Sequence, residues 1–249
     1  MKIFILFLII SCFPIVSFSQ VCESPEEISC DGIDNNGDGL TDNGQNLNCI
    51  CGGNQNGGNI VCNVFVTSGT FFGDLVDEAA PLPCFSSGMN GIHAADCICQ
   101  EHANDAGLSG TYYAWISMIA DNGAVTTPAS RFSQVSSPET IEFRLVDTAG
   151  SLIATNFSDL LDGSLSRPLN IIESGVIAPA GLFTVFTGTG NNGSASVNDC
   201  NEWNNPSAGS RGVNGNLRVN NIWSDKLQRG GDPQEEDCDT RRSLYCFEQ

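Results

Sequence analysis

The chain has 249 residues, of which 29 are Asp or Glu and 10 are Lys or Arg, so its formal net charge is −19. This acidic balance argues against nucleic-acid binding and against docking on anionic lipid, because both need clustered Lys and Arg. Twelve cysteines are too many for an ordinary reduced cytosolic protein, and no dinucleotide-binding, Walker or HExxH motif is present. The composition is typical of a secreted, disulfide-bonded protein and excludes the common nucleotide-dependent enzymes.

Residues 1–19 have the features of a signal peptide. Lys2 precedes an apolar run, and small residues lead up to an expected cleavage site after Ser19. Pro14 interrupts the apolar stretch, so we do not expect a membrane span to remain after cleavage. An alternative is a lipobox that ends at Cys12, which would make the protein a surface lipoprotein. Both interpretations place the mature chain outside the cytoplasm, secreted or at the cell surface.

Cleavage after Ser19 would remove Cys12 and leave 11 of the 12 cysteines. An odd number implies one free thiol or one bond to another chain. The sequence does not show which cysteine is left over, nor how the first seven of the mature chain pair: Cys22, Cys30, Cys49, Cys51, Cys62, Cys84 and Cys97.

Residues 20–59 form an acidic segment that is rich in Gly and Asn. From Val21 to Cys62 the chain has seven acidic residues and no Lys or Arg. It lacks apolar periodicity, and such a segment buries too little apolar surface to offset the entropy lost on ordering. We therefore expect disulfides or a bound cation to order it.

The run from Cys30 to Asp42 has the alternating oxygen ligands of a calcium loop. Gln45 stands where an EF-hand has its bidentate acid, so we expect a Kd of about 10⁻⁴ to 10⁻³ M. The run resembles the aspartate-rich MopE-type motif and, more loosely, dockerin and thrombospondin type-3 loops, which implies that calcium stiffens this segment. The alternative is a solvated acidic turn cluster. The candidate ligands are Asp34, Asn36, Asp38, the carbonyl of Leu40, and Asp42.

Residues 60–249 combine predicted strands with two helices. Apolar residues at helical spacing predict a helix from Ala95 to Ala106 that stops at Gly107, and a second, short helix covers residues 158–161. This pattern predicts an α+β fold. Runs of β-branched and aromatic residues predict strands at 64–66, 111–119, 142–146, 182–187 and 244–247.

Three segments of this region resemble endostatin: GIHAADCICQEHANDAGLSGTYYAWIS at 91–117, NFSDLLDGSLSRPLN at 156–170, and FTGTGNNG at 186–193. The cysteine spacing in NDCNEW and CDTRRSLYCFE is also similar, and a family of bacterial secreted domains of uncharacterised function shares the likeness. The resemblance covers most of residues 62–249 and implies a disulfide-stapled, C-type-lectin-like (endostatin-like) domain over 60–249.

The resemblance also implies two nested disulfides, Cys99–Cys246 outside and Cys200–Cys238 inside. Cys84 and Cys97 could form a third bond, because they flank the Gly-rich turn before the predicted helix.

The ligand-binding residues of these families are not reproduced. No Glu-Pro-Asn triplet is present, and Trp203-Asn204-Asn205 follows Cys200 instead of preceding the penultimate cysteine, so calcium-dependent sugar binding of the lectin type is not implied. The N-terminal histidines of the endostatin zinc site are missing. The arginines are spread between Arg131 and Arg242, so heparin binding is not expected.

Trp203 and Trp223 are the candidate ligand-contacting residues, because both lie in polar loops after residue 187. The alternative is that both pack beneath these loops. His93 and His102 do not share a helix face, so we do not expect both to bind one metal, and no GxSxG nucleophile elbow is present. We therefore expect a non-catalytic binding module for an extracellular glycan or matrix protein; the alternative is a structural envelope or stalk component.

Overall fold

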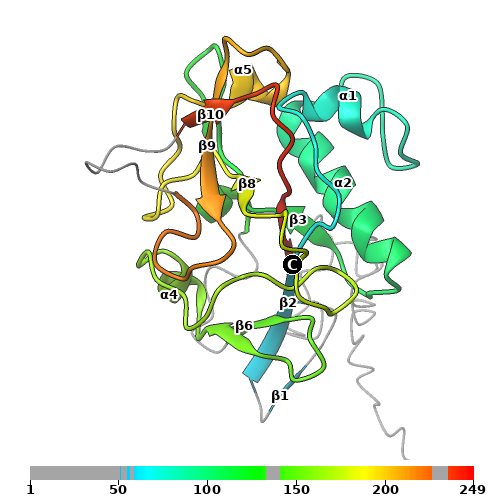
Figure 1. The fold of residues 1–249 in the computed structure, drawn as a ribbon, viewed down its shortest axis with the longest axis vertical. Coiled ribbons are helices and arrows are strands. Elements are labelled where there is room, and N and C mark those ends of the chain that lie inside the picture. Colours follow the sequence, from blue (N-terminus) through cyan, green and yellow to red (C-terminus); the bar gives the residue numbers. More distant parts are fainter. Residues whose placement is uncertain (1–50, 52–54, 57–58, 133–140, 226–234) are drawn as a thin grey trace, which may run out of the picture. The chain divides into compact units, whose positions relative to one another are not determined.

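A six-stranded mixed sheet forms the centre of the structure, in strand order β3-β11-β2-β6-β7 with β1 paired to β2 (Figure 1). The computed structural model describes residues 51, 55–56, 59–132, 141–225 and 235–249. Strand β2 (Asn59–Val66) pairs antiparallel with β11 (Tyr245–Glu248) and parallel with β6 (Ile141–Leu145). The remaining strands of this sheet are β1 (Gln55–Asn56), β3 (Tyr112–Ala114) and β7 (Leu152–Ala154).

Two smaller sheets carry the rest of the strands. The first has the order β10-β9-β8 and consists of β8 (Thr184–Phe186), β9 (Arg211–Asn216) and β10 (Glu235–Asp237). The second is the pair β4 (Met118–Ile119) and β5 (Val125–Thr126).

The single strand predicted over residues 111–119 is interrupted in the structure. The backbone N–H of Trp115 still donates to Tyr245 O, at 2.9 Å, next to the main sheet. Two residues later the N–H of Ser117 donates to Thr187 O, at 2.8 Å, so the chain has moved to the region of the small sheet. Aromatic and β-branched composition predicts an extended chain but not this change of pairing partner.

The longest helix is α2 (Gly91–Asp105). The side chain of Asn90 caps it by accepting from the His93 N–H, and the helix ends before Gly107, whose φ of 70° suits glycine. It begins four residues before the predicted start at Ala95. The other helices are α1 (Leu75–Ala79), α3 (Pro128–Arg131) and α4 (Phe157–Leu160).

The segment α5 (Cys200–Trp203) is a left-handed turn, because all four of its residues have φ between 54° and 60°. This conformation costs about 1–2 kcal/mol per residue for L-amino acids. The turn is held by the Asp199 side chain, which accepts from the Glu202 N–H, and by the disulfide of Cys200.

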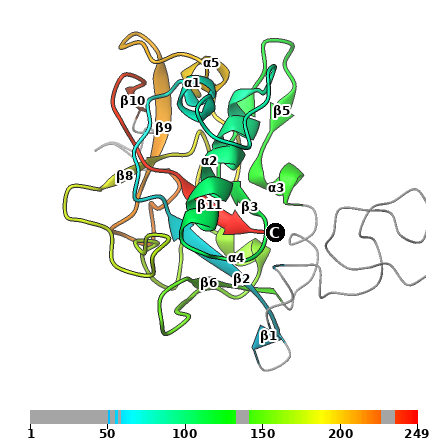
Figure 2. The same ribbon diagram turned by 90° about the vertical axis from the view of Figure 1, so that its right-hand side faces the viewer.

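Alternate residues of the central strands divide the core into two clusters, one on each face of the sheet. Val64 and Phe247 belong to the cluster around Trp115 and Trp223. Phe65 and its antiparallel neighbour Cys246 belong to the cluster that includes the buried face of α2. Figure 2 shows α2 lying across strands β3 and β11, so this helix covers one face of the sheet.

Four disulfides link the described residues. Cys99–Cys246 joins α2 to β11 across 147 residues of sequence, and Cys200–Cys238 joins α5 to the end of β10. These are the two pairs that the endostatin resemblance implies. The structure also pairs Cys84 with Cys97, and Cys51 with Cys62. In the described part of the chain, no helix is long and apolar enough to cross a membrane.

Candidate functional site

The two tryptophans predicted as candidate ligand contacts are wholly buried, with exposed fractions of 0% for both Trp203 and Trp223. The Trp203 indole N–H donates to Ser117 O at 2.8 Å, and the ring packs against Phe186. The Trp223 ring lies 4.8 Å from that of Trp115, in the core. Their burial agrees with the alternative that both rings pack beneath the loops, and burial of these large apolar rings stabilises that packing.

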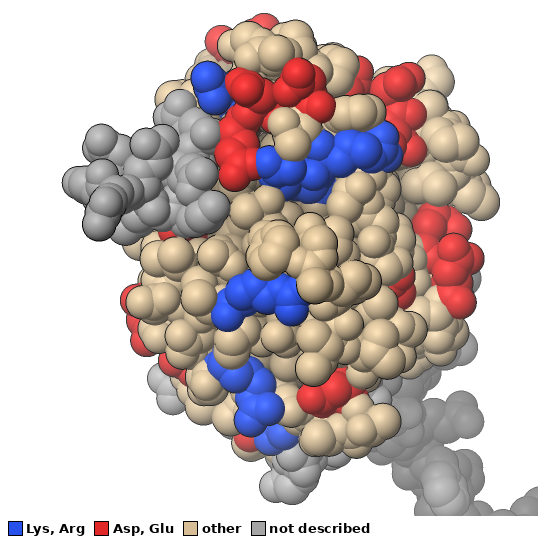
Figure 3. Space-filling view, in the orientation of Figure 1, with Lys and Arg blue, Asp and Glu red and all other residues tan. Residues whose placement is uncertain are grey.

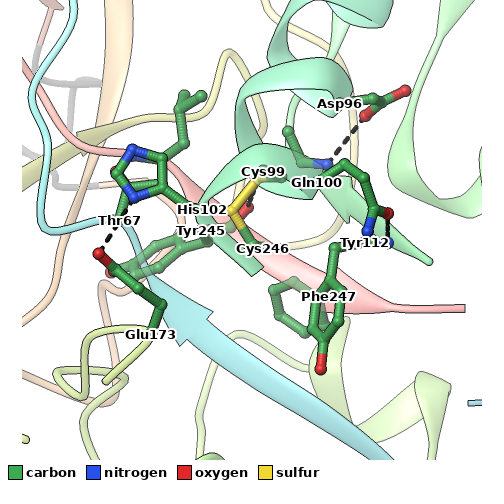
Figure 4. The surroundings of a disulfide bond; sticks show 12 residues. Thr67, Asp96, Cys99, Gln100, His102, Tyr112, Glu173, Tyr245, Cys246 and Phe247 are labelled. Carbon is green, nitrogen blue, oxygen red and sulfur yellow. Dashed lines mark hydrogen bonds and ion pairs between the residues drawn. A yellow bond between two sulfur atoms is a disulfide. The ribbon is translucent and has the colours of Figure 1, made fainter. Parts of the chain in front are cut away.

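The predicted metal ligands are not among the described residues, and the two histidines lie near opposite ends of α2. Asp34, Asn36, Asp38, Leu40 and Asp42 fall outside the described residues. His93 is exposed at the start of α2, whereas His102, near its end, contacts Glu173 through Nδ1 at 3.1 Å (Figure 4). Within the described ranges, no group of three or more His, Cys, Asp or Glu side chains is arranged to hold a metal.

A pocket of about 480 Å³ lies between α2, strand β3 and the loop that precedes α2. This volume is within the range of small-molecule sites. It is lined by Cys84, Ser86, Ser87, Gly88, Met89, His93, Asp96, Cys97, Gln100, Thr111, Tyr112 and Tyr113.

One helix face supplies the α2 wall of the pocket. His93, Asp96, Cys97 and Gln100 stand at positions i, i+3, i+4 and i+7, which places them in one row along the helix. The facing loop is tied to this row by the Cys84–Cys97 disulfide. The third wall is the chain around β3, to which Asp96 and Gln100 reach (Figure 4).

Two of these helix side chains cap the free edge of the main sheet. Gln100 Oε1 accepts from the Tyr112 N–H and Asp96 Oδ1 accepts from the Ala114 N–H, both at 2.9 Å. Arg131 completes the edge, because its guanidinium pairs with Asp96 and donates to Ala114 O at 2.9 Å. These contacts replace the missing neighbour strand and protect the edge from pairing with another chain.

Burial raises the pKa of the Asp96 carboxyl, and the charge of Arg131 together with the Ala114 hydrogen bond offsets this only in part. The Asp96 carboxylate is thus already bonded to Ala114 and Arg131 at the sheet edge. The polar groups of the pocket that are left to meet a ligand are the exposed side chains of Ser86, Ser87, His93 and Thr111. With the partly exposed ring of Tyr113, they offer hydrogen bonds and one aromatic surface.

A second pocket, of about 360 Å³, is acidic. It is lined by Phe72, Asp74, Asp77, Glu78, Pro206 and Asp239. Arg241 lies 4.5 Å above the Phe72 ring and pairs with Glu78 at 3.1 Å, which neutralises part of the local charge. Sequence reasoning missed both pockets. One sequence feature could have indicated the pocket beside α2, namely the row of His, Asp, Cys and Gln on the predicted helix. The acidic pocket has no such local pattern, because its lining residues come from segments far apart in the sequence.

The basic side chains do not form one continuous patch. Figure 3 shows them in separate groups on the face in view, and acidic side chains border the uppermost group. Five described arginines form ion pairs with carboxylates: Arg131, Arg144, Arg211, Arg241 and Arg242. This pairing weakens the attraction that a sulfated or phosphorylated polymer would feel.

The described chain is thus a disulfide-stapled, mixed α/β protein with a polar pocket between its main helix and a capped sheet edge. It belongs to the family described as protein of unknown function (DUF1554), whose model matches residues 83–220, more than half of the sequence. A comparison with curated proteins gives no match. Neither comparison identifies endostatin or the MopE-type motif. All residues that line the pocket beside α2 fall inside the matched range.

Proposed function

We propose that this chain is a secreted or cell-surface, non-catalytic binding module that recognises an extracellular glycan or matrix protein. The observation that carries the proposal is the pocket between α2 and β3, with its exposed hydroxyls and imidazole. It is built on a helix tied by two disulfides, Cys84–Cys97 and Cys99–Cys246, and a rigid frame of this kind limits the entropy lost on binding.

The lining chemistry favours a neutral, polyhydroxylated ligand. Ser86, Ser87 and Thr111 both donate and accept hydrogen bonds, as sugar hydroxyls do. Tyr113 offers an aromatic face for the apolar side of a sugar ring. Asp96 already forms an ion pair with the Arg131 guanidinium, so its charge would attract a cationic ligand less strongly.

The C-type-lectin-like, endostatin-like form of the fold, α+β in class, belongs to the same proposal. It is supported by the two disulfides Cys99–Cys246 and Cys200–Cys238, which the resemblance implied. We further propose that calcium stiffens the acidic segment through the oxygen ligands from Asp34 to Asp42, at a distance in sequence from the pocket.

A second candidate function is a structural envelope or stalk component without a dedicated ligand. The specific observation in its favour is the burial of Trp203 and Trp223, which removes the aromatic loop residues that a sugar-binding surface would display.

Binding of the purified mature protein to arrays of glycans and matrix proteins, with calcium and with EDTA, tests the proposal. We expect selective binding that survives EDTA and that falls in His93→Ala, because His93 is an exposed residue of the pocket wall. The matched control is Asp105→Ala, an exposed substitution at the other end of α2. Absence of binding in both buffers would overturn the binding-module proposal in favour of the structural one.

A further inference from the structure

One of the four described disulfides differs from the others in its access to solvent. The cysteines of Cys51–Cys62, Cys99–Cys246 and Cys200–Cys238 all have exposed fractions of 0%. Cys97 is 5% exposed, and Cys84 is only partly buried.

Both Cys84 and Cys97 line the pocket beside α2. A small thiol that enters this pocket therefore meets a disulfide on its wall, whereas the sulfurs of Cys99–Cys246 lie beneath the helix, in the core (Figure 4). The rate of thiol–disulfide exchange depends on access to the attacked sulfur.

We propose that Cys84–Cys97 is a thiol–disulfide exchange site that reacts with small extracellular thiols through this pocket. The thiolate attacks Sγ of Cys84, the more exposed cysteine of the pair; a new S–S bond forms as the Cys84–Cys97 bond breaks, and Cys97 leaves as a thiolate that takes a proton from solvent. A second thiolate then displaces Cys84 from the mixed disulfide. In sum, two small thiols are oxidised to one disulfide and the protein gains two thiols.

The fold retains other anchors for the loop when this bond opens. Leu82, Phe85 and Met89 pack against the core cluster beneath α2, and the Asn90 side chain still caps the helix. Opening the bond therefore frees the pocket wall at residues 86–88, between the Phe85 and Met89 anchors, without removing the core contacts of the domain. The consequence that ligand binding responds to thiols rests on the proposed function; the exchange reaction itself does not.

Differential alkylation tests the exchange site. The intact mature protein is incubated with glutathione in native buffer, quenched with an alkylating reagent at intervals, and digested for mass spectrometry. We expect Cys84 and Cys97 to be labelled about tenfold or more faster than Cys99, Cys246, Cys200 and Cys238. Labelling of Cys84 and Cys97 together with these four, at the rate of global unfolding, would overturn the proposal.

Two variants sharpen this experiment. The double variant Cys84→Ser/Cys97→Ser is expected to lose the fast phase while its circular dichroism stays native. Ser87→Trp narrows the pocket with an indole and is expected to slow the fast phase without changing the slow ones; an unchanged fast rate would exclude entry through the pocket. Because no glycan or matrix protein enters this assay, fast exchange without any ligand on the arrays would contradict the proposed function alone.

Discussion

Gln100 and Tyr112 are joined by a hydrogen bond of 2.9 Å, in which the side chain of the helix residue accepts the backbone N–H of the strand residue. Asp96 makes the equivalent bond to Ala114 one helical turn earlier. Because β3 is the outer strand of the main sheet, these contacts satisfy groups that a neighbour strand would otherwise bind. One face of α2 therefore closes the sheet and forms a wall of the pocket.

This double role predicts a large effect of Asp96→Ala. The substitution leaves the guanidinium of Arg131, whose side chain is only 11% exposed, without its carboxylate. We expect the free energy of unfolding to fall by about 3–5 kcal/mol, as for other broken buried ion pairs. Denaturant titration measures the change, with Asp105→Ala as the exposed control on the same helix. Equal stability of the two variants would show that the capped edge contributes nothing.

The contact between α2 and the left-handed turn α5 predicts that Gly91 tolerates no side chain. A Cβ on Gly91 would overlap the backbone oxygen of Glu202 and Cβ of Trp203. We expect Gly91→Ala to destabilise the protein by about 1–3 kcal/mol through overpacking. Gly181→Ala is the matched control, because nothing lies within 4 Å of a Cβ built there. A thermal unfolding midpoint for Gly91→Ala that equals the control would contradict the close approach.

The Glu173 carboxylate predicts a loss of stability in acid. Burial raises the pKa of Glu173, but its hydrogen bonds with His102 and Ser68 together lower the pKa by more than burial raises it. The folded-state pKa of Glu173 therefore lies below the ordinary value. A group with a lowered pKa stabilises the fold above its unfolded pKa, about 4.3, and this contribution is lost as pH falls through the folded-state value. Denaturant titrations from pH 6 down to about pH 3 should therefore show a shallower decline for Glu173→Gln than for the parent. Asp105→Asn serves as the exposed carboxylate control and should follow the parent; a parallel decline of Glu173→Gln would refute the assignment.

The burial of all three tryptophans predicts a distinctive fluorescence. Trp115, Trp203 and Trp223 are at most 1% exposed, so we expect blue-shifted emission and weak quenching by acrylamide in the native protein. Unfolding in guanidinium should shift the emission to the red and make it quenchable. Strong quenching of the native protein would show that at least one indole is exposed, and would restore the loop tryptophans as candidate ligand contacts.

The disulfide pattern predicts where the odd cysteine lies. The structure pairs eight cysteines in four disulfides. A chain that starts after Ser19 has three further cysteines, Cys22, Cys30 and Cys49. We expect one free thiol per denatured, unreduced chain, or a disulfide-linked dimer on a non-reducing gel. The triple Cys→Ser variant at these positions should abolish both signals, and Cys84→Ser/Cys97→Ser should not. A reactive thiol that survives the triple variant would place the odd cysteine among the eight.

Several features could be predicted from local sequence. The apolar spacing around Ile98 predicted α2, and β-branched runs predicted β6, β8 and β11 within two residues of their observed bounds. The strand predicted at 64–66 covers only the last three residues of β2, which begins at Asn59. The sequence predicted one strand over residues 111–119 where the structure has two, because aromatic and β-branched composition predicts an extended backbone but not the strand with which it pairs. Local sequence left two alternatives open for Trp203 and Trp223, since an aromatic ring among polar residues is found both in binding loops and in small cores; the structure shows that both rings are buried.

The sequence by itself determined the acidic, cysteine-rich character of the protein, the periodicity of its main helix and the cysteines available for pairing, because these depend on composition and on neighbours within a few positions. Only the tertiary structure decided where the pocket lies and which disulfide it reaches. Its walls come from a loop, a helix face and a sheet edge that meet through the Cys84–Cys97 bond and the capping contacts of Asp96 and Gln100. Such contacts depend on how separate segments pack, which residue spacing along the chain does not record.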